Sequence, residues 1–195
     1  MKSPFNYIVE TKNRYKNKIG ELVVNTEITE RDAIFVNRVG TIMATPIYSP
    51  NGSLPLGSEV LVHHNVFRRW VGMDGKEKNS GSYLEEDKYI VHEDQIFAYK
   101  EDGEWKACEG YCFVEPRENE DTWINGNEQL LTGIMRYPDN NLTKQGVNPG
   151  DIVGFTPNSE YEFTIEEQKL YRILSYHINI NYGFKENAKE EAGSS

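Results

Sequence analysis

The sequence has few cysteines, no long apolar run and no sustained helical pattern. Its 195 residues include two cysteines, Cys108 and Cys112, which lie four apart with no second pair to complete a zinc site. No apolar run approaches the length that a bilayer needs, and the opening MKSPFNYIVE lacks a signal-peptide core. These absences predict reduced thiols, no metal site and a cytoplasmic protein without a membrane partner.

Positive charge is also scarce. Acidic residues number 31 against 21 lysines and arginines, which gives a formal net charge of −10 and disfavours nucleic acid as a partner. His63 and His64, taken as adjacent strand positions, would point to opposite faces and could not grip one metal ion. The sequence has neither a phosphate-binding glycine motif nor GxSxG. We therefore expect a protein that is not an enzyme and that holds no cofactor.

The sequence is rich in short segments of β-branched and aromatic residues. Turn signals such as Pro50-Asn51-Gly52 and Asp74-Gly75 separate them. The best candidate for a helix, Ile165–Leu174, fits a hairpin arm equally well. Many short strands with regular turns predict an all-β fold made of small barrels or sandwiches. The strands expected in the first half are 5–10, 33–36, 40–45, 59–62, 89–92 and 96–99.

A second set of segments echoes the first in the same order, which indicates a tandem repeat. The matched blocks are Asn6–Glu10 with Tyr111–Glu115, Thr41–Met43 with Gly133–Met135, Pro55–Val60 with Asn148–Val153, and Lys88–His92 with Tyr171–Ser175. The charged run 101–109 is the expected linker between them. We predict one domain over 1–100, a second over 110–181, and a disordered tail over 182–195.

One stretch of the first repeat, residues 16–38, has only a shorter counterpart in the second. In it, Leu22-Val23-Val24 follows Gly20 and Glu21, and the polar run NTEITERD comes directly afterwards. A core strand would continue to alternate apolar and polar residues, and this segment does not. The triplet therefore has the pattern of an exposed apolar motif that binds a partner. An ordinary edge strand over GELVVN is the alternative. The first repeat also carries an insertion at 63–88, which we expect to form a hairpin whose arm includes Arg68-Arg69-Trp70.

In the order of these motifs, each repeat resembles a GroES-type co-chaperonin subunit, the small β-barrel that caps chaperonin rings. Gly20–Val24 (GELVV) resembles the family's mobile loop, and Val39–Ala44 (VGTIMA) resembles the strand that follows it. Leu54–Val60 (LPLGSEV) and Val147–Phe155 (VNPGDIVGF) resemble the glycine-turn strand. The second repeat departs from the family, because it lacks the apolar triplet and its closing strand, YRILSYHINI, lacks the acidic pattern.

The resemblance implies two tandem GroES-like small β-barrels that cap a GroEL-type chaperonin ring and assist protein folding. The residues implied to contact the chaperonin are Gly20, Glu21, Leu22, Val23 and Val24. Loops that order on binding bind weakly one at a time, so several copies must engage together.

The family's assembly is a homo-oligomeric ring. The resemblance therefore implies that Tyr7–Glu10 and either Ile96–Tyr99 or Ile178–Ile180 lie at subunit or inter-barrel contacts. A long, insertion-bearing form without a transit peptide is typical of bacteriophages, which implies the host cytoplasm. The alternative function is a phage virion or assembly protein that keeps the barrel without capping activity.

Overall fold

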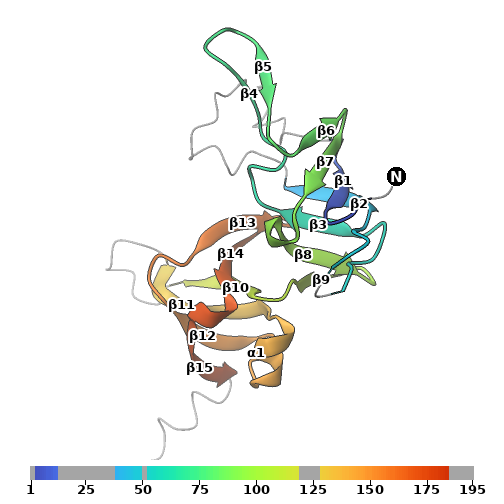
Figure 1. The fold of residues 1–195 in the computed structure, drawn as a ribbon. Coiled ribbons are helices and arrows are strands. Elements are labelled where there is room, and N and C mark those ends of the chain that lie inside the picture. The colour runs from blue at the N-terminus through green and yellow to red at the C-terminus, as the bar shows by residue number, and fades with distance from the viewer. Residues whose placement is uncertain (1–2, 13–37, 50–51, 119–127, 185–195) are drawn as a thin grey trace, which may run out of the picture. The chain divides into compact units, whose positions relative to one another are not determined.

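The computed structural model describes residues 3–12, 38–49, 52–118 and 128–184, and in them it confirms an all-β fold. The chain divides into two compact units, Met1–Trp105 and Lys106–Ser195 (Figure 1). The division falls inside the predicted linker 101–109. That segment is not an irregular connector, because strand β9 (Glu104–Ala107) occupies its middle and buries Trp105.

Unit 1 contains a seven-stranded sheet with the order β6-β7-β1-β2-β3-β8-β9. The remaining bounds are β1 (Tyr7–Glu10), β2 (Val39–Ala44), β3 (Glu59–Val62), β6 (Tyr83–Glu85), β7 (Lys88–Val91), the 3-10 turn η2 (Glu93–Gln95) and β8 (Ile96–Glu101). The insertion at 63–88 holds a separate antiparallel hairpin of β4 (Arg69–Val71) and β5 (Glu77–Asn79). The predicted hairpin is therefore present, and its turn is closed by a bond from Gly75 N to Gly72 O. The expected strand at 33–36 lies outside the described residues.

Unit 2 contains a six-stranded sheet with the order β13-β14-β10-β11-β12-β15. Its elements are β10 (Tyr111–Glu118), β11 (Glu128–Tyr137), the short helix α1 (Asn140–Lys144), β12 (Asp151–Phe155), β13 (Tyr161–Ile165), β14 (Gln168–Leu174), the 3-10 turn η3 (Ser175–His177) and β15 (Ile178–Phe184). Ile165 pairs with Gln168, so the ambiguous stretch from Ile165 is a hairpin arm and not a helix. β15 runs to Phe184, so the expected disorder from residue 182 is wrong for its first three residues.

The two sheets have the same strand order. Strands β6, β7, β1, β2, β3 and β8 stand in unit 1 where β13, β14, β10, β11, β12 and β15 stand in unit 2, and β9 is an additional edge strand of unit 1. The registers also agree: Val9 pairs with Ile42 in unit 1, and Val114 pairs with Met135 in unit 2. A register shift precedes Val9 and Val114 alike. The two units are therefore equivalent at the level of single residues.

This equivalence corrects two of the matched blocks by one residue. Met135 corresponds to Ile42 and not to Met43, and Tyr171 corresponds to Tyr89, one position beyond the sequence match. The physical reason is alternation, because a slip of one residue turns a side chain to the other face of the sheet. Ile42 and Met135 are 1% and 0% exposed, whereas Met43 is 47% exposed.

Gly40 and Gly133 occupy equivalent places beside the first strand of each unit. A Cβ on Gly40 would lie 2.5 Å from Cγ1 of Val9, and one on Gly133 would be closer still to Cγ1 of Val114 and 2.7 Å from the carbonyl oxygen of Glu115. Neither position has room for a side chain without displacing its neighbours.

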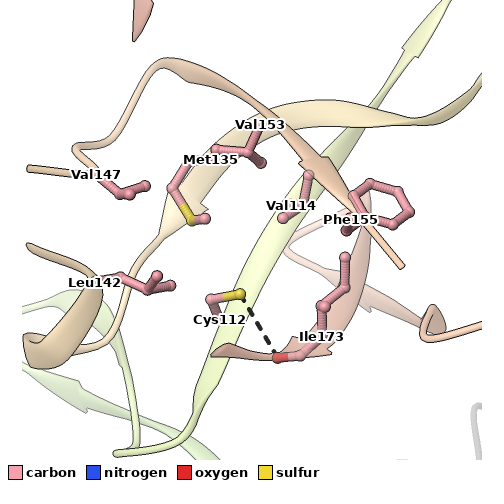
Figure 2. Packing of buried hydrophobic residues seen from close by; sticks show 8 residues of the cluster. All are labelled: Cys112, Val114, Met135, Leu142, Val147, Val153, Phe155 and Ile173. Atoms are coloured by element: carbon pink, nitrogen blue, oxygen red, sulfur yellow. Dashed lines mark hydrogen bonds between the residues drawn. The ribbon is translucent and has the colours of Figure 1, made fainter. Parts of the chain in front are cut away.

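Buried apolar residues form a separate core cluster within unit 2 (Figure 2). Its members are Cys112, Val114, Met135, Leu142, Val147, Val153, Phe155 and Ile173. The thiol of Cys112 donates to the carbonyl oxygen of Ile173 at 3.6 Å, and burial raises the pKa of this thiol. Both cysteines are free, as predicted, and Cys112 stays protonated because its thiolate would be desolvated.

Among the described residues, the strand pairing closes neither sheet. Within the described ranges the end strands are β6 and β9 in unit 1, and β13 and β15 in unit 2. The described residues therefore form two large antiparallel sheets of one topology and the small β4–β5 sheet, without the closed barrels that the sequence predicts.

Candidate functional site

The predicted chaperonin-binding residues Gly20–Val24 lie outside the described residues, but both ends of their segment are described. Thr11, directly after β1, is 4% exposed. Its hydroxyl donates to the carbonyl oxygen of Val39 at 3.1 Å, and its backbone N–H donates to the carbonyl oxygen of Asp87 at 2.9 Å. The chain therefore leaves the sheet and returns to it at one point.

The returning end of the segment is held as firmly. The backbone N–H of Val62 donates to the carbonyl oxygen of Arg38 at 2.8 Å, and the Arg38 side chain is buried. The bonds at Thr11 and Arg38 thus tie the base of residues 13–37 to β2, to β3 and to the residue before β7. A buried, hydrogen-bonded base resists local opening.

Unit 2 is built differently at the equivalent place. There β10 and β11 continue outward, and Glu118 pairs with Glu128 before the chain passes into residues 119–127. β10 and β11 are longer than β1 and β2, and the segment that connects β10 to β11 is shorter than the one that connects β1 to β2. The sequence predicts that the two repeats differ in this segment. In the structure the segment of unit 1 starts and ends on the short strands β1 and β2, whereas that of unit 2 starts and ends on the long strands β10 and β11.

Two histidines and two arginines, His63, His64, Arg38 and Arg68, lie close together next to this base. His63 and His64 follow β3, and their ring centroids are 4.3 Å apart. Burial, followed by the charges of His63, Arg38 and Arg68, lowers the pKa of His64 to about 4, so this ring is neutral at pH 7. The expectation that the two rings point to opposite faces is wrong, because His63 and His64 lie past the end of the strand, where alternation no longer applies.

A metal site does not follow from this contact between rings. Among the described residues, no three His, Cys, Asp or Glu side chains gather closely enough to hold a metal ion. Arg68 instead lies over the ring of Trp70, with 5.1 Å from its guanidinium carbon to the ring centroid, which fits the expected hairpin arm.

The strands that the resemblance assigns to subunit contacts differ in their availability. β1 already pairs with β2 and β7 along Tyr7–Glu10, and β8, which includes Ile96–Tyr99, lies between β3 and β9, so neither is an end strand of its sheet. Among the strands of the described residues, β15 pairs with β12 alone. Its sequence, ININYGF, carries no charge, and Ile180, Tyr182 and Phe184 are about half exposed. Native edge strands are normally protected by charge, so β15 is the candidate contact strand.

Comparison with known proteins assigns no family. No family model matches the chain, and no curated protein matches it at a significant level. Within the part of the chain that the structure describes, no helix is long and apolar enough to cross a membrane.

Proposed function

We propose that this chain is a non-enzymatic co-chaperonin of the GroES type, with two tandem barrel-related units. It assembles as a homo-oligomeric ring, caps a GroEL-type chaperonin and contacts it through Gly20–Val24, in the host cytoplasm if a bacteriophage encodes it. The observation that carries the proposal is the buried anchoring of Thr11 and Arg38 on either side of the segment that holds the triplet.

The mechanism follows from the anchored base and the apolar triplet. Leu22, Val23 and Val24 would enter an apolar groove of the chaperonin, where one aliphatic side chain contributes about 1.5–3 kcal/mol. Ordering the segment costs conformational entropy, so one loop binds weakly and several loops on a ring bind together. The firm base transmits the pull of a bound loop to the sheet, and weak single loops allow the cap to leave.

Assembly is assigned to β15, the open, uncharged edge strand of unit 2. A strand of a neighbouring copy would extend the sheet there and cover Ile180 and Tyr182. Light scattering of the full chain at micromolar concentration is expected to give a defined oligomer. Ile180→Lys, which places a charge on this edge, is expected to reduce its mass.

The test of capping is ATP-dependent co-sedimentation with a GroEL-type chaperonin. Val23→Asp should abolish it, because a carboxylate would enter an apolar groove, while the melting temperature stays unchanged. Ile124→Asp, in the corresponding segment of unit 2, is the matched control and should still co-sediment. A large fall in melting temperature for Val23→Asp would mean that the triplet belongs to a core strand.

The phage virion or assembly protein remains the second candidate. It is favoured by unit 2, which has the sheet and the open β15 edge but no apolar triplet in residues 119–127. A stable oligomer that does not bind chaperonin with or without ATP would support this candidate and refute capping.

A further inference from the structure

Unit 1 has a hollow of about 530 Å³ that opens to solvent between two turns. Its lining is Pro55–Glu59, which leads into β3, and Lys100–Gly103, which ends β8. Gly57 contributes to the lining with a φ of +83°, and a Cβ built on it would meet nothing within 4 Å. The space above this glycine is therefore empty.

In unit 2 the equivalent space is filled by an aromatic ring. The N–H of Gly57 donates to the carbonyl oxygen of Ile42 at 2.9 Å, and the N–H of Gly150 donates to that of Met135 at 2.8 Å, so the two glycines are equivalent. A Cβ on Gly150 would lie 2.6 Å from Cε2 of Phe184. The phenyl ring thus lies directly over the backbone of this glycine.

The ring comes from the last strand of unit 2. β15 continues to Phe184, which pairs with Asp151 directly after the glycine. The equivalent strand β8 ends with Lys100 and Glu101, and none of the residues that line the hollow is aromatic. The Phe184 ring of unit 2 therefore indicates that an aromatic ring fits over the glycine backbone that is uncovered at Gly57 in unit 1.

The charges around the hollow favour a partner in which a positively charged residue lies next to the aromatic residue. Glu59, Glu101 and Asp102 contribute three carboxylates, against the single ammonium of Lys100. Lys100 lies 3.8 Å from the Glu59 carboxylate and 5.6 Å from the centre of the Trp105 ring. The residues that line the hollow therefore carry more formal negative charge than positive charge.

We propose that this hollow binds a partner protein through an aromatic side chain adjacent to a lysine or arginine. The ring lies over Gly57 as the Phe184 ring lies over Gly150, and the neighbouring cation faces the mainly acidic lining of the hollow. This site belongs to unit 1 and needs neither the apolar triplet nor the β15 edge. It is a second recognition site beyond the proposed capping function.

The test is a nuclear magnetic resonance titration of the full chain, labelled with nitrogen-15, with N-acetyl-Phe-Arg-amide. Saturable shifts are expected in the amide signals of Gly57, Ser58 and Gly103 but not in that of Gly150, where Phe184 occupies the site. Replacing phenylalanine by alanine in the peptide, or arginine by glutamate, should weaken binding at least about tenfold.

Two protein variants complete the experiment. Glu59→Gln combined with Glu101→Gln should weaken peptide binding several-fold, whereas Glu162→Gln, an exposed acid on β13 of unit 2, should leave it unchanged. Equal binding of the alanine peptide, or shifts that spread over the protein surface, would overturn the proposal, because the ring would then make no specific contact. Val23→Asp should bind the peptide like the unchanged chain, so this test and the capping test fail independently.

Discussion

Asp139 offers a sharp test of how unit 2 is held together. Its carboxylate is 1% exposed and accepts three hydrogen bonds. Oδ2 accepts from the N–H of Gly110 and from the hydroxyl of Ser175, and Oδ1 accepts from the N–H of Leu142, all at 2.8 Å. One side chain thus joins the turn before β10, the first turn of α1 and the start of η3.

The magnitude follows from these bonds. Hydrogen bonds to a charged acceptor contribute about 1.5–3 kcal/mol each, and Asp139→Ala would also leave donors of Gly110 and Leu142 without this acceptor. Relief of the buried charge offsets part of the loss, so we expect the alanine variant to lose about 3–5 kcal/mol of unfolding free energy. Asp139→Asn keeps one acceptor but presents an amide N–H₂ group to a donor, and about 2 kcal/mol should be lost.

Urea unfolding measures these changes, and hydrogen exchange read by mass spectrometry assigns them to a unit. Faster exchange is expected in β10 and β14 of unit 2, with β1 and β7 of unit 1 unchanged. Asn140→Ala, an exposed neighbour on α1, is the matched control and should stay within about 0.5 kcal/mol. A loss below about 1 kcal/mol for Asp139→Ala would show that the three bonds add little to stability.

Three further changes test other parts of the fold. Gly40→Ala and Gly133→Ala should each destabilise their own unit by about 1–3 kcal/mol in urea unfolding, because the added Cβ meets a buried valine; equal stability would refute the close approach. Glu166 and Glu167 form a two-residue turn with φ of 49° and 67°, so the double change to Asn-Gly should raise stability by about 1–2 kcal/mol, and a lower melting temperature would contradict this. The folded-state pKa of His64, about 4, lies below its ordinary value of 6.5, so the unfolded chain takes up the proton first. Stability is therefore full above about pH 6.5 and falls towards pH 4, by about 1–2 kcal/mol after allowance for solvent screening of a half-exposed ring; His64→Gln should lose this share of the pH dependence of melting, and an unchanged dependence would contradict it.

Local chemistry explains what could be predicted about the candidate sites and what could not. Apolar periodicity and glycine signals led to the β4–β5 hairpin and to the equivalence of Gly57 and Gly150, because turns and positive φ depend on residues close in sequence. β15 was only one of several strands that the sequence predicted to make subunit contacts. Choosing β15 among them required the sheet order, which shows that β1 and β8 have neighbours on both sides.

The hollow above Gly57 had no signal in the sequence. It exists because β8 ends without an aromatic residue where β15 carries Phe184, and this comparison needs both strand registers. The contact between His63 and His64 was missed for a related reason. Their separation on opposite faces assumed that β3 continues past Val62, and the end of a strand depends on pairing with distant residues.

By itself, the sequence determined the β-rich class, the free thiols and the order of the repeated blocks. These features depend on composition and on short-range patterns of alternation and turns. Tertiary structure decided the register, and with it which member of each block faces the core: Ile42 and Met135 are buried, while Met43 is exposed. It also made β9 a strand within an expected linker and, in the part of the chain that the structure describes, left both large sheets without closure into barrels. The physical reason is that strand pairing is non-local, so a shift of one residue preserves the letters of a motif but reverses the face of every side chain.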